Sequence, residues 1–184
     1  LFRSLGYDVQ MEAINNVLFD YERSGSRYTT GIEDHPEEAV GTKFQFQFIN
    51  NFYINRDASK PEIEAVLKHG VIEPLEVYFA GNLGPQRKTN DLDRLTGVAT
   101  DTKLSLAESS AEVRRQIVDR QLFTTPIPVK IDTAEEAFHR VLAEAGANLR
   151  RDTVDERILA NVRAGHFGQI LKSQADVGGW PKLD

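Results

Sequence analysis

Apolar and polar residues alternate in three short stretches of the first half of the chain. These stretches cover residues 9–19, 43–54 and 74–82, and the alternation is plainest in "FQFQF", where every second residue is Phe. A period of two is typical of a strand with one buried face. The pattern therefore predicts three β-strand regions, separated by long polar segments.

Two of the separating segments carry their own signals. Residues 22–41 are rich in Gly, Ser, Pro and charge, which predicts an exposed loop. Residues 60–70 begin near Pro61 and end at Gly70, as a short helix would. The same segment also fits a loop that contains one short strand, and the pattern does not decide between the two.

The period changes near residue 100. Residues 107–121 are polar with Val113, Ile117 and Val118 at helical spacing, and residues 122–131 carry two prolines that favour an extended run. Two amphipathic helices are then predicted, over residues 133–146 and 152–165. Their expected capping and closing residues are Thr133 with Glu136 and Gly146 for the first helix, and Asp152 and Gly165 for the second.

A doubled asparagine repeats within the strand regions. "INN" occurs at 14–16 and again at 49–51, and "GN" takes its place at 81–82. Asn51 follows Asn16 by 35 positions, and Asn82 follows Asn51 by 31. Such intervals are typical of a solenoid, in which equivalent residues stack about 4.8 Å apart and side-chain amides can form a ladder. We favour this solenoid over an antiparallel sandwich in which the asparagines mark hairpin ends.

Composition narrows the function classes. The net charge of −6 argues against a general nucleic-acid binder, because phosphate binding needs a basic surface. The absence of cysteine excludes disulfides and thiolate metal sites, and no apolar run approaches the roughly 20 residues of a membrane span. "LFRSLGYDVQ" reads as the interior of a domain, so we expect the chain to follow a cleavage or to be a fragment.

The order of these motifs resembles a known family. The coils "INNVLFDY" and "INNFYI", then "EVYFAGN", and above all the tail with "RDTVDER" and "VGGWP" are similar to the C-terminal part of pectate lyases of polysaccharide lyase family 1. The resemblance implies an all-β solenoid, a right-handed parallel β-helix. Residues 1–100 would form its terminal coils with long loops. Residues 101–184 would form a C-terminal extension of amphipathic helices that packs on the β-helix.

The resemblance also implies an activity. Members cleave α-1,4-polygalacturonate by calcium-dependent β-elimination, in which Ca²⁺ bridges substrate carboxylates to the protein and an arginine removes the proton. We therefore expect a secreted, monomeric pectate lyase whose partner is an acidic polysaccharide, with no nucleic acid and no membrane. A separate chain carrying the N-terminal part of the same enzyme is a further candidate partner.

The family pattern places little of the active site in this chain. In that register Arg3 resembles a substrate-binding arginine, while the catalytic arginine and the calcium ligands fall before Leu1, so no metal ligand is assigned here. Arg27 lies in the loop after the first coil and Lys43 lies just beyond it; both are candidate substrate-binding residues, against the alternative of a solvated loop. Two other functions stay open: a β-helix module that binds acidic polysaccharide without cleaving it, and a structural solenoid.

Several other residues are expected to be structural. The four histidines share no metal-binding spacing, and the acidic run 33–38 reads as solvated charge. Asp152 and Asp155 are placed to cap a helix rather than to do chemistry. Trp180, within "VGGWP", is expected to anchor the tail rather than to stack on a sugar.

Overall fold

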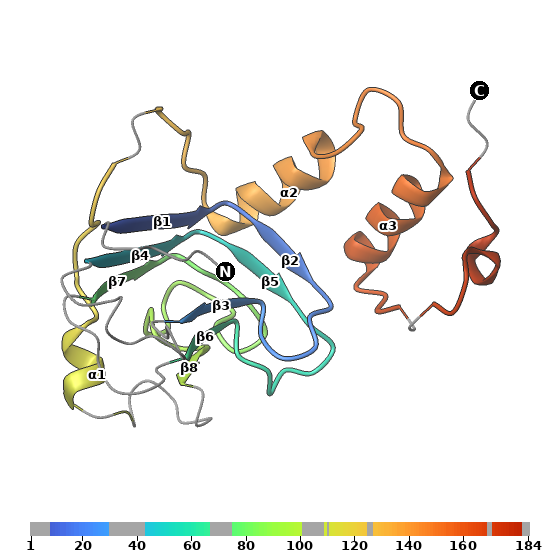
Figure 1. The fold of residues 1–184 in the computed structure, drawn as a ribbon. Helices are drawn as coiled ribbons and strands as arrows, with labels where there is room; N and C mark the ends of the chain where they lie inside the picture. Colours follow the sequence, from blue (N-terminus) through green and yellow to red (C-terminus); the bar gives the residue numbers. More distant parts are fainter. Residues whose placement is uncertain are drawn as a thin grey trace.

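The computed structural model describes residues 8–29, 43–66, 75–100, 109, 111–124, 127–168 and 171–181 (Figure 1). Within these residues, eight strands come first, followed by the helices of the C-terminal extension. The strands are β1 (Val9–Ile14), β2 (Val17–Phe19), β3 (Ser26–Thr29), β4 (Phe44–Ile49), β5 (Phe52–Ile54), β6 (Ile63–Val66), β7 (Leu75–Ala80) and β8 (Val98–Thr100). The helices are α1 (Ala111–Arg115), α2 (Ala134–Glu144), α3 (Thr153–Ala164) and the short 3₁₀ helix η3 (Gln174–Val177).

The strands form three parallel sheets, in the orders β1–β4–β7, β2–β5 and β3–β6–β8. Each pass of the chain therefore contributes one strand to each sheet, with Leu83 extending the second sheet as an isolated parallel bridge to Phe52. In the first sheet, Val9 pairs with Phe44 and Phe44 with Leu75. These are the intervals of the asparagine repeat, so all three predicted strand regions are confirmed.

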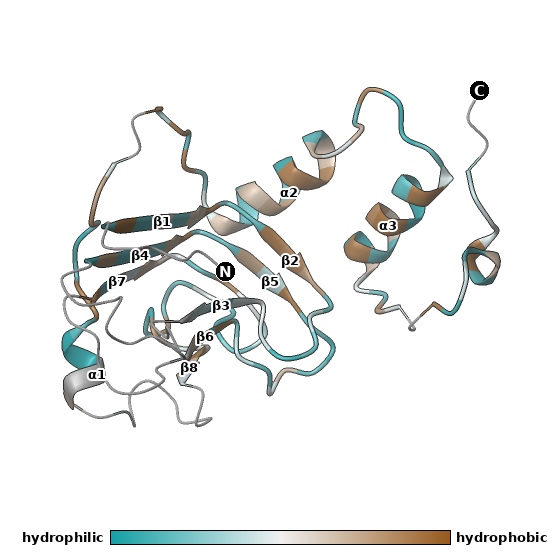
Figure 2. Ribbon diagram, in the orientation of Figure 1, coloured by the Kyte–Doolittle hydropathy of each residue, from teal (hydrophilic) through white to brown (hydrophobic). Residues whose placement is uncertain are grey.

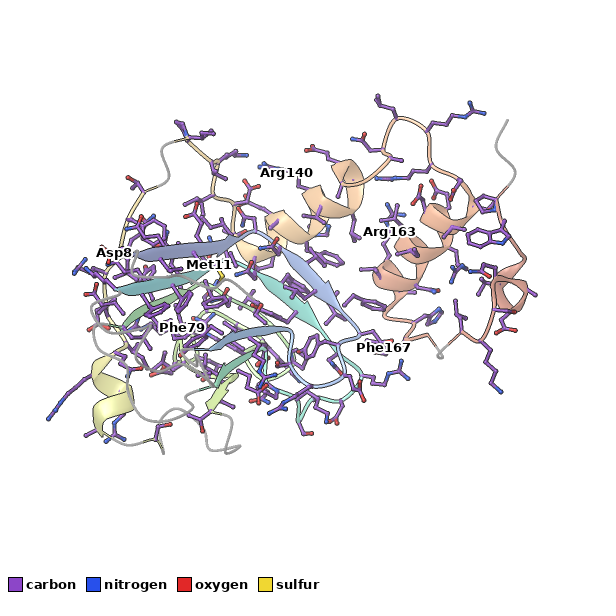
Figure 3. All side chains as sticks on the ribbon, viewed as in Figure 1. Asp8, Met11, Phe79, Arg140, Arg163 and Phe167 are labelled. Atoms are coloured by element: carbon purple, nitrogen blue, oxygen red, sulfur yellow. The ribbon has the colours of Figure 1, made fainter. Side chains whose placement is uncertain are left out.

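The apolar core lies between the sheets. The inward-facing residues of β4 and β7 fill it, and Phe48, Val77 and Phe79 are almost completely buried. Figure 3 labels Phe79 among these interior side chains. Phe48 and Phe79 stack with ring centroids 5.7 Å apart, so the alternation of the sequence becomes a column of aromatic rings.

The prediction of an exposed loop over residues 22–41 is wrong in part. Ser26–Thr29 form β3, and Tyr28 is buried in the core, with its ring 5.6 Å from that of Phe46 and 5.8 Å from that of Phe48. Burial of this single aromatic ring offsets the polar character of its neighbours. Residues 30–42 lie outside the described part of the chain.

The segment 60–70, for which the sequence left a helix and a loop with one strand as alternatives, contains a short strand. β6 occupies Ile63–Val66, which supports the alternative of a loop with one strand over that of a helix. Ile63 and Ala65 face the core, while the intervening Glu64 belongs to the opposite face of the sheet. Gly70 lies outside the described residues.

The first asparagine of each pair makes the turn between the first two sheets. Asn15 and Asn50 have φ angles of 54° and 52°, and Gly81 takes the same place in the third pass with a φ of 61°. Asn and Gly tolerate this left-handed conformation better than other residues. The doubled asparagine is therefore a sharp turn that joins two strands without a loop.

The second asparagine of each pair builds a ladder. Asn16 Nδ2 donates to Asn51 Oδ1 at 2.9 Å, and Asn51 Nδ2 donates to Asn82 Oδ1 at 2.8 Å. The predicted stacking of Asn16, Asn51 and Asn82 is confirmed. Buried amides need partners, and the ladder supplies them at the point where the backbone bends.

Within the segment 107–121, the structure describes residue 109 and residues 111–121. In these residues helix covers Ala111–Arg115, and Ile117, which the helical spacing included, instead bridges to Val77. The Val77 amide donates to the Gln116 carbonyl at 2.8 Å, and the Val118 amide donates to the Val77 carbonyl at 3.0 Å. The edge of β7 competes for these backbone groups, because an unpaired strand edge offers hydrogen bonds.

The two later helices match their predictions closely. Thr133 and Glu136 form the expected capping box at α2, and Asp152 caps α3 by accepting from the amides of Val154 and Asp155. Gly165 closes α3 with a φ of 62°. Local capping signals therefore suffice to set the starts of both helices.

Two aromatic contacts join the later part of the extension to the sheets. At α2, the ring of Phe138 lies 4.9 Å from that of Phe52 on β5, and Figure 2 shows hydrophobic residues on β2, β5 and α2. Beyond α3, Phe167 stacks on Phe19 at 5.2 Å. Arg56 lies 5.5 Å from the Phe167 ring and donates to the Gly168 carbonyl at 2.6 Å.

The prediction that Trp180 anchors the tail is wrong. Trp180 is 76% exposed. Gly178 and Gly179, at φ angles of 94° and 84°, turn the chain just before it. These glycines permit the turn, and the indole beyond it stays largely exposed.

Candidate functional site

The candidate substrate-binding residues fall in different parts of the structure. Arg3 lies outside the described residues. Arg27 belongs to β3, whereas Lys43 directly precedes β4 in another sheet. Arg27 and Lys43 therefore do not share one site; each is instead part of its own charged cluster.

Arg27 lies beside a buried carboxylate. It pairs in register with Glu64 on β6, and the Arg27 Nε atom is 3.8 Å from Glu64 Oε2. Arg23 donates to Glu64 Oε1 from both Nε and Nη2, at 3.0 and 2.7 Å. The Ser24 hydroxyl donates to Oε2 at 3.3 Å. We refer to Arg23, Arg27 and Glu64 as the arginine cluster.

The arginine cluster faces away from the core. Ile63 and Ala65 point inward on either side of Glu64, and Tyr28 points inward next to Arg27, so strand alternation places Arg27 and Glu64 on the outer face. The Glu64 side chain is 6% exposed, while those of Arg23 and Arg27 are 61% and 47% exposed. The carboxylate is thus covered by the two guanidinium groups that it holds.

This arrangement suits an anionic ligand. Two permanently charged guanidinium groups surround one carboxylate, so the cluster carries a local excess of positive charge on a protein of net charge −6. Guanidinium groups bind carboxylates through paired N–H donors of matching geometry. Glu64 fixes both arginines, and the Arg27 side chain, at 47% exposure, is open to solvent beyond this contact.

Lys43 forms the second charged cluster. Its Nζ lies 3.2 Å from Glu76 Oε2, and Arg120 Nη2 lies 3.3 Å from Glu76 Oε1. Gln45 donates to Glu76 Oε2 at 2.6 Å. The Gln45 hydrogen bond, with the nearby Lys43 and Arg120 charges, holds the pKa of Glu76 below its usual range. We refer to Lys43, Glu76 and Arg120 as the lysine cluster.

Sequence reasoning missed the partners in both clusters. Arg23 falls in the segment 22–41, for which a solvated loop was preferred over a substrate-binding role, and Glu64, Glu76 and Arg120 were not singled out. The register offset that pairs Arg27 with Glu64 is 37 residues, whereas the asparagine repeat gives 35. The only available signal was the position of Glu64 between two apolar residues, "IEA", which marks an outward-facing acidic residue on a strand.

A third group of polar residues lies inside the protein. Glu62 is 3% exposed, and its Oε1 accepts from the amides of Gln86 and Arg87 at 2.7 and 3.3 Å. Its Oε2 and the buried Tyr21 hydroxyl have no hydrogen-bond partner within the described structure. Burial raises the pKa of Glu62, so the carboxyl group binds its proton more tightly than a free glutamate does.

Glu62 is enclosed rather than open to a ligand. A Cβ atom added at Gly84 would lie 2.5 Å from Glu62 Oε1, and one added at Gly97 would lie 1.8 Å from Oε2. The two glycines thus pack directly on the carboxyl group. We assign Glu62 to the support of the loop that contains Gln86 and Arg87.

The described residues contain no group of three or more His, Cys, Asp or Glu side chains that could hold a metal ion. His139 and His166 lie in or beside helices and share no such group, whereas His35, His69 and the acidic run 33–38 fall outside the described residues. Within the described part of the chain, none of the helices has the length and apolar character required to span a membrane.

Comparison of the chain with models of protein families, with curated proteins and with solved structures found no match.

Proposed function

We propose that this chain is the terminal part of a right-handed parallel β-helix that acts on an acidic polysaccharide, as a pectate lyase does on α-1,4-polygalacturonate. The arginine cluster carries the proposal, because it presents two oriented guanidinium groups on the outer face of a parallel sheet. The motif order of the tail and the asparagine ladder are consistent with the same family. The proposed reaction is β-elimination in a secreted, monomeric enzyme.

Under this proposal the described residues bind substrate rather than break its bonds. Arg27 would hold a uronate carboxylate, and Glu64, which Arg23 also engages, would keep the Arg27 guanidinium group in place. The described carboxylates do not form a calcium site: Glu64 and Glu76 are each engaged by two cations. The family resemblance assigns neither calcium ligands nor the proton-abstracting arginine to the described residues.

The test is the activity of the protein on polygalacturonate. Unsaturated uronates absorb in the ultraviolet, so β-elimination should produce a steady rise in absorbance when Ca²⁺ is present. A chelator in excess over Ca²⁺ should abolish the rise. No rise with or without calcium would contradict the lyase proposal.

The charged clusters also favour a second candidate function. Both lie on described residues and need no catalytic group to bind an anionic chain. The second candidate function is therefore that of a module that holds acidic polysaccharide without cleaving it. Retardation in a gel containing polygalacturonate, together with an unchanged ultraviolet absorbance, would support this function over the lyase.

A further inference from the structure

The buried carboxyl group of Glu62 joins the two ends of one loop. The loop covers residues 84–97, between β7 and β8, and we refer to it as the Glu62 loop. Near its start, the Gln86 and Arg87 amides donate to Glu62 Oε1 at 2.7 and 3.3 Å. At its end, a Cβ atom added at Gly97 would lie 1.8 Å from Oε2. One side chain therefore contacts the loop at both ends.

The two oxygens of Glu62 hold the loop in different ways. Oε1 receives two N–H donors, which remain good partners whether the carboxyl group is neutral or ionised. Oε2 has no hydrogen-bond partner among the described residues, and Gly97 packs directly against it. Ionisation would leave this buried oxygen charged and without a donor, which is costly. The cost falls on the contact with Gly97 and not on the contacts with Oε1.

The titratable and charged groups around Glu62 do not remove that cost. Burial raises the pKa of Tyr21, which follows β2, and of Tyr53 on β5, so both rings stay uncharged. The Tyr53 hydroxyl is paired with that of Ser26 at 2.9 Å. Arg87, in the loop itself, is the cation whose charge acts on Glu62 in the described structure. Its guanidinium group is committed to backbone carbonyls, at distances down to 2.7 Å.

The closed loop therefore favours the neutral carboxyl group. Burial raises the pKa of Glu62, and the hydrogen bonds from the Gln86 and Arg87 amides oppose this effect only in part. The group consequently changes its charge at a higher pH than an exposed glutamate does.

We propose that protonation of Glu62 controls the closure of the Glu62 loop. With the carboxyl group neutral, Oε2 lies against Gly97 and the loop is closed. When the carboxyl group loses its proton, the Gly97 end separates and water reaches Oε2, while the Gln86 and Arg87 amides stay attached through Oε1. This pH-dependent change is a property of the fold and does not rest on the proposed function.

A second attachment limits how far the loop can open. Arg94 donates to the Phe79 and Val118 carbonyls at 3.3 and 3.0 Å, which fastens the loop just before its end. The opening is therefore confined to the segment that follows Arg94, residues 95–97. Local opening of so few residues requires much less free energy than unfolding of the whole protein.

The opening acts on one edge of the third sheet. The Ile63 amide donates to the Gly97 carbonyl at 3.2 Å, at the point where β6 and β8 begin to pair. β3 pairs with β6 on its other side, and that pairing holds Arg27 opposite Glu64. Separation of Gly97 thus loosens the start of β8 and leaves the register of the arginine cluster unchanged.

The experiment follows the protein by nuclear magnetic resonance from pH 4 to pH 8. The chemical shift of the Glu62 carboxyl carbon reports its ionisation, and backbone relaxation reports the mobility of each amide. We expect the Thr96 and Gly97 amides to have order parameters of about 0.85 while Glu62 is neutral, falling below about 0.6 as it ionises. The Gln86 amide, at the attached end, should stay rigid throughout.

Glu62→Gln should keep the loop closed at every pH, because the amide keeps Oε1 and carries no ionisable proton. The matched control is Glu12→Gln, which changes a carboxyl group on the first sheet that accepts from Gln47 at 2.8 Å. Its loop should open as in the parent protein. Three results would overturn the proposal: a rigid Gly97 while Glu62 ionises, a Glu62 that stays neutral to pH 8, or pH-dependent mobility that persists in Glu62→Gln. If Glu62→Gln does not fold, the parent protein decides alone, since mobility and carboxyl shift must follow the same titration.

Discussion

The side chain of Asn50 occupies the space into which a side chain at Gly81 would project. A Cβ atom added at Gly81 would lie 1.7 Å from Asn50 Oδ1. The Nδ2 atom of the same Asn50 side chain donates to the Asp132 carbonyl at 2.6 Å, so it is not free to move aside. The third pass thus has "GN" where the first two have "NN" because only one side chain fits at that level of the turn.

We predict that Gly81→Ala destabilises the protein strongly. The left-handed backbone alone costs a residue with a Cβ about 1–2 kcal/mol, and the contact with Asn50 adds to this cost. Gly146→Ala is the matched control, because Gly146 has a φ of 72° but nothing within 4 Å of an added Cβ. Urea unfolding should show a clearly larger loss in the free energy of unfolding for Gly81→Ala than for Gly146→Ala. Equal losses would mean that the Asn50 side chain moves aside without destabilising the protein.

The middle of the asparagine ladder should be more sensitive than its end. Asn51→Ala removes the acceptor of Asn16 and the donor to Asn82 from a fully buried position, and we expect a loss of about 2–4 kcal/mol. Asn16→Ala removes only the outermost member and should cost less. Chemical unfolding of both variants measures the difference, and a larger loss at Asn16 would contradict the ladder as the source of stability.

Glu62 should make the protein less stable as the pH rises. Burial raises the pKa of this carboxyl group in the folded state, so the folded protein binds the proton more tightly than the unfolded chain. Its contribution to stability is complete below the unfolded pKa, near 4.3, and is lost as the pH rises through the folded pKa.

Glu62→Gln should remove that dependence. The amide keeps an Oε1 acceptor for the Gln86 and Arg87 amides but carries no ionisable proton. Urea unfolding from pH 4 to pH 8 should show that the variant gains stability relative to the parent protein as the pH increases. Parallel curves for the two proteins would show that Glu62 does not titrate in this range.

The arginine cluster should govern affinity for polygalacturonate. Arg27→Ala and Arg23→Ala each remove one guanidinium group, and we expect affinity at low salt to fall by about tenfold in each case, in line with one charge-assisted hydrogen bond. Glu64→Gln should also weaken binding, because it releases both arginines without removing positive charge.

Lys130→Ala is the control for loss of charge alone. Lys130 is exposed and pairs with Asp132, on a different segment from the arginine cluster. Affinity electrophoresis in polygalacturonate gels at two salt concentrations compares the four variants. A loss of affinity in Lys130→Ala equal to that in Arg27→Ala would show that binding follows net charge and not the cluster.

The elements that could be predicted from the sequence are those determined by residues close together in the chain. The alternation "FQFQF" and the capping residues Thr133 and Asp152 act within a few residues, so their strands and helices could be inferred directly. β3 was missed because "SRYT" contains one apolar side chain, Tyr28. The reason for its strand lies in Phe46 and Phe48, which are distant in sequence.

The candidate site was predictable only in part for the same reason. Arg27 could be selected as a cation next to a coil, but its partner Glu64 depends on a register that differs from that of the asparagine repeat. Trp180 illustrates the opposite error. An apolar side chain beside two glycines suggested an anchor, yet whether it is buried depends on the surface that the turn happens to face.

The attachment of Asp132 to the asparagine turns has a consequence for the order in which the protein folds. Asn15 and Asn50 donate to the Asp132 carbonyl across 117 and 82 residues of sequence, so the docking point exists only after two passes have paired. Contacts of such long range must overcome a large loop-closure entropy and are slow to form. We therefore expect α2 to dock late, with the stacked passes acting as the template on which it folds.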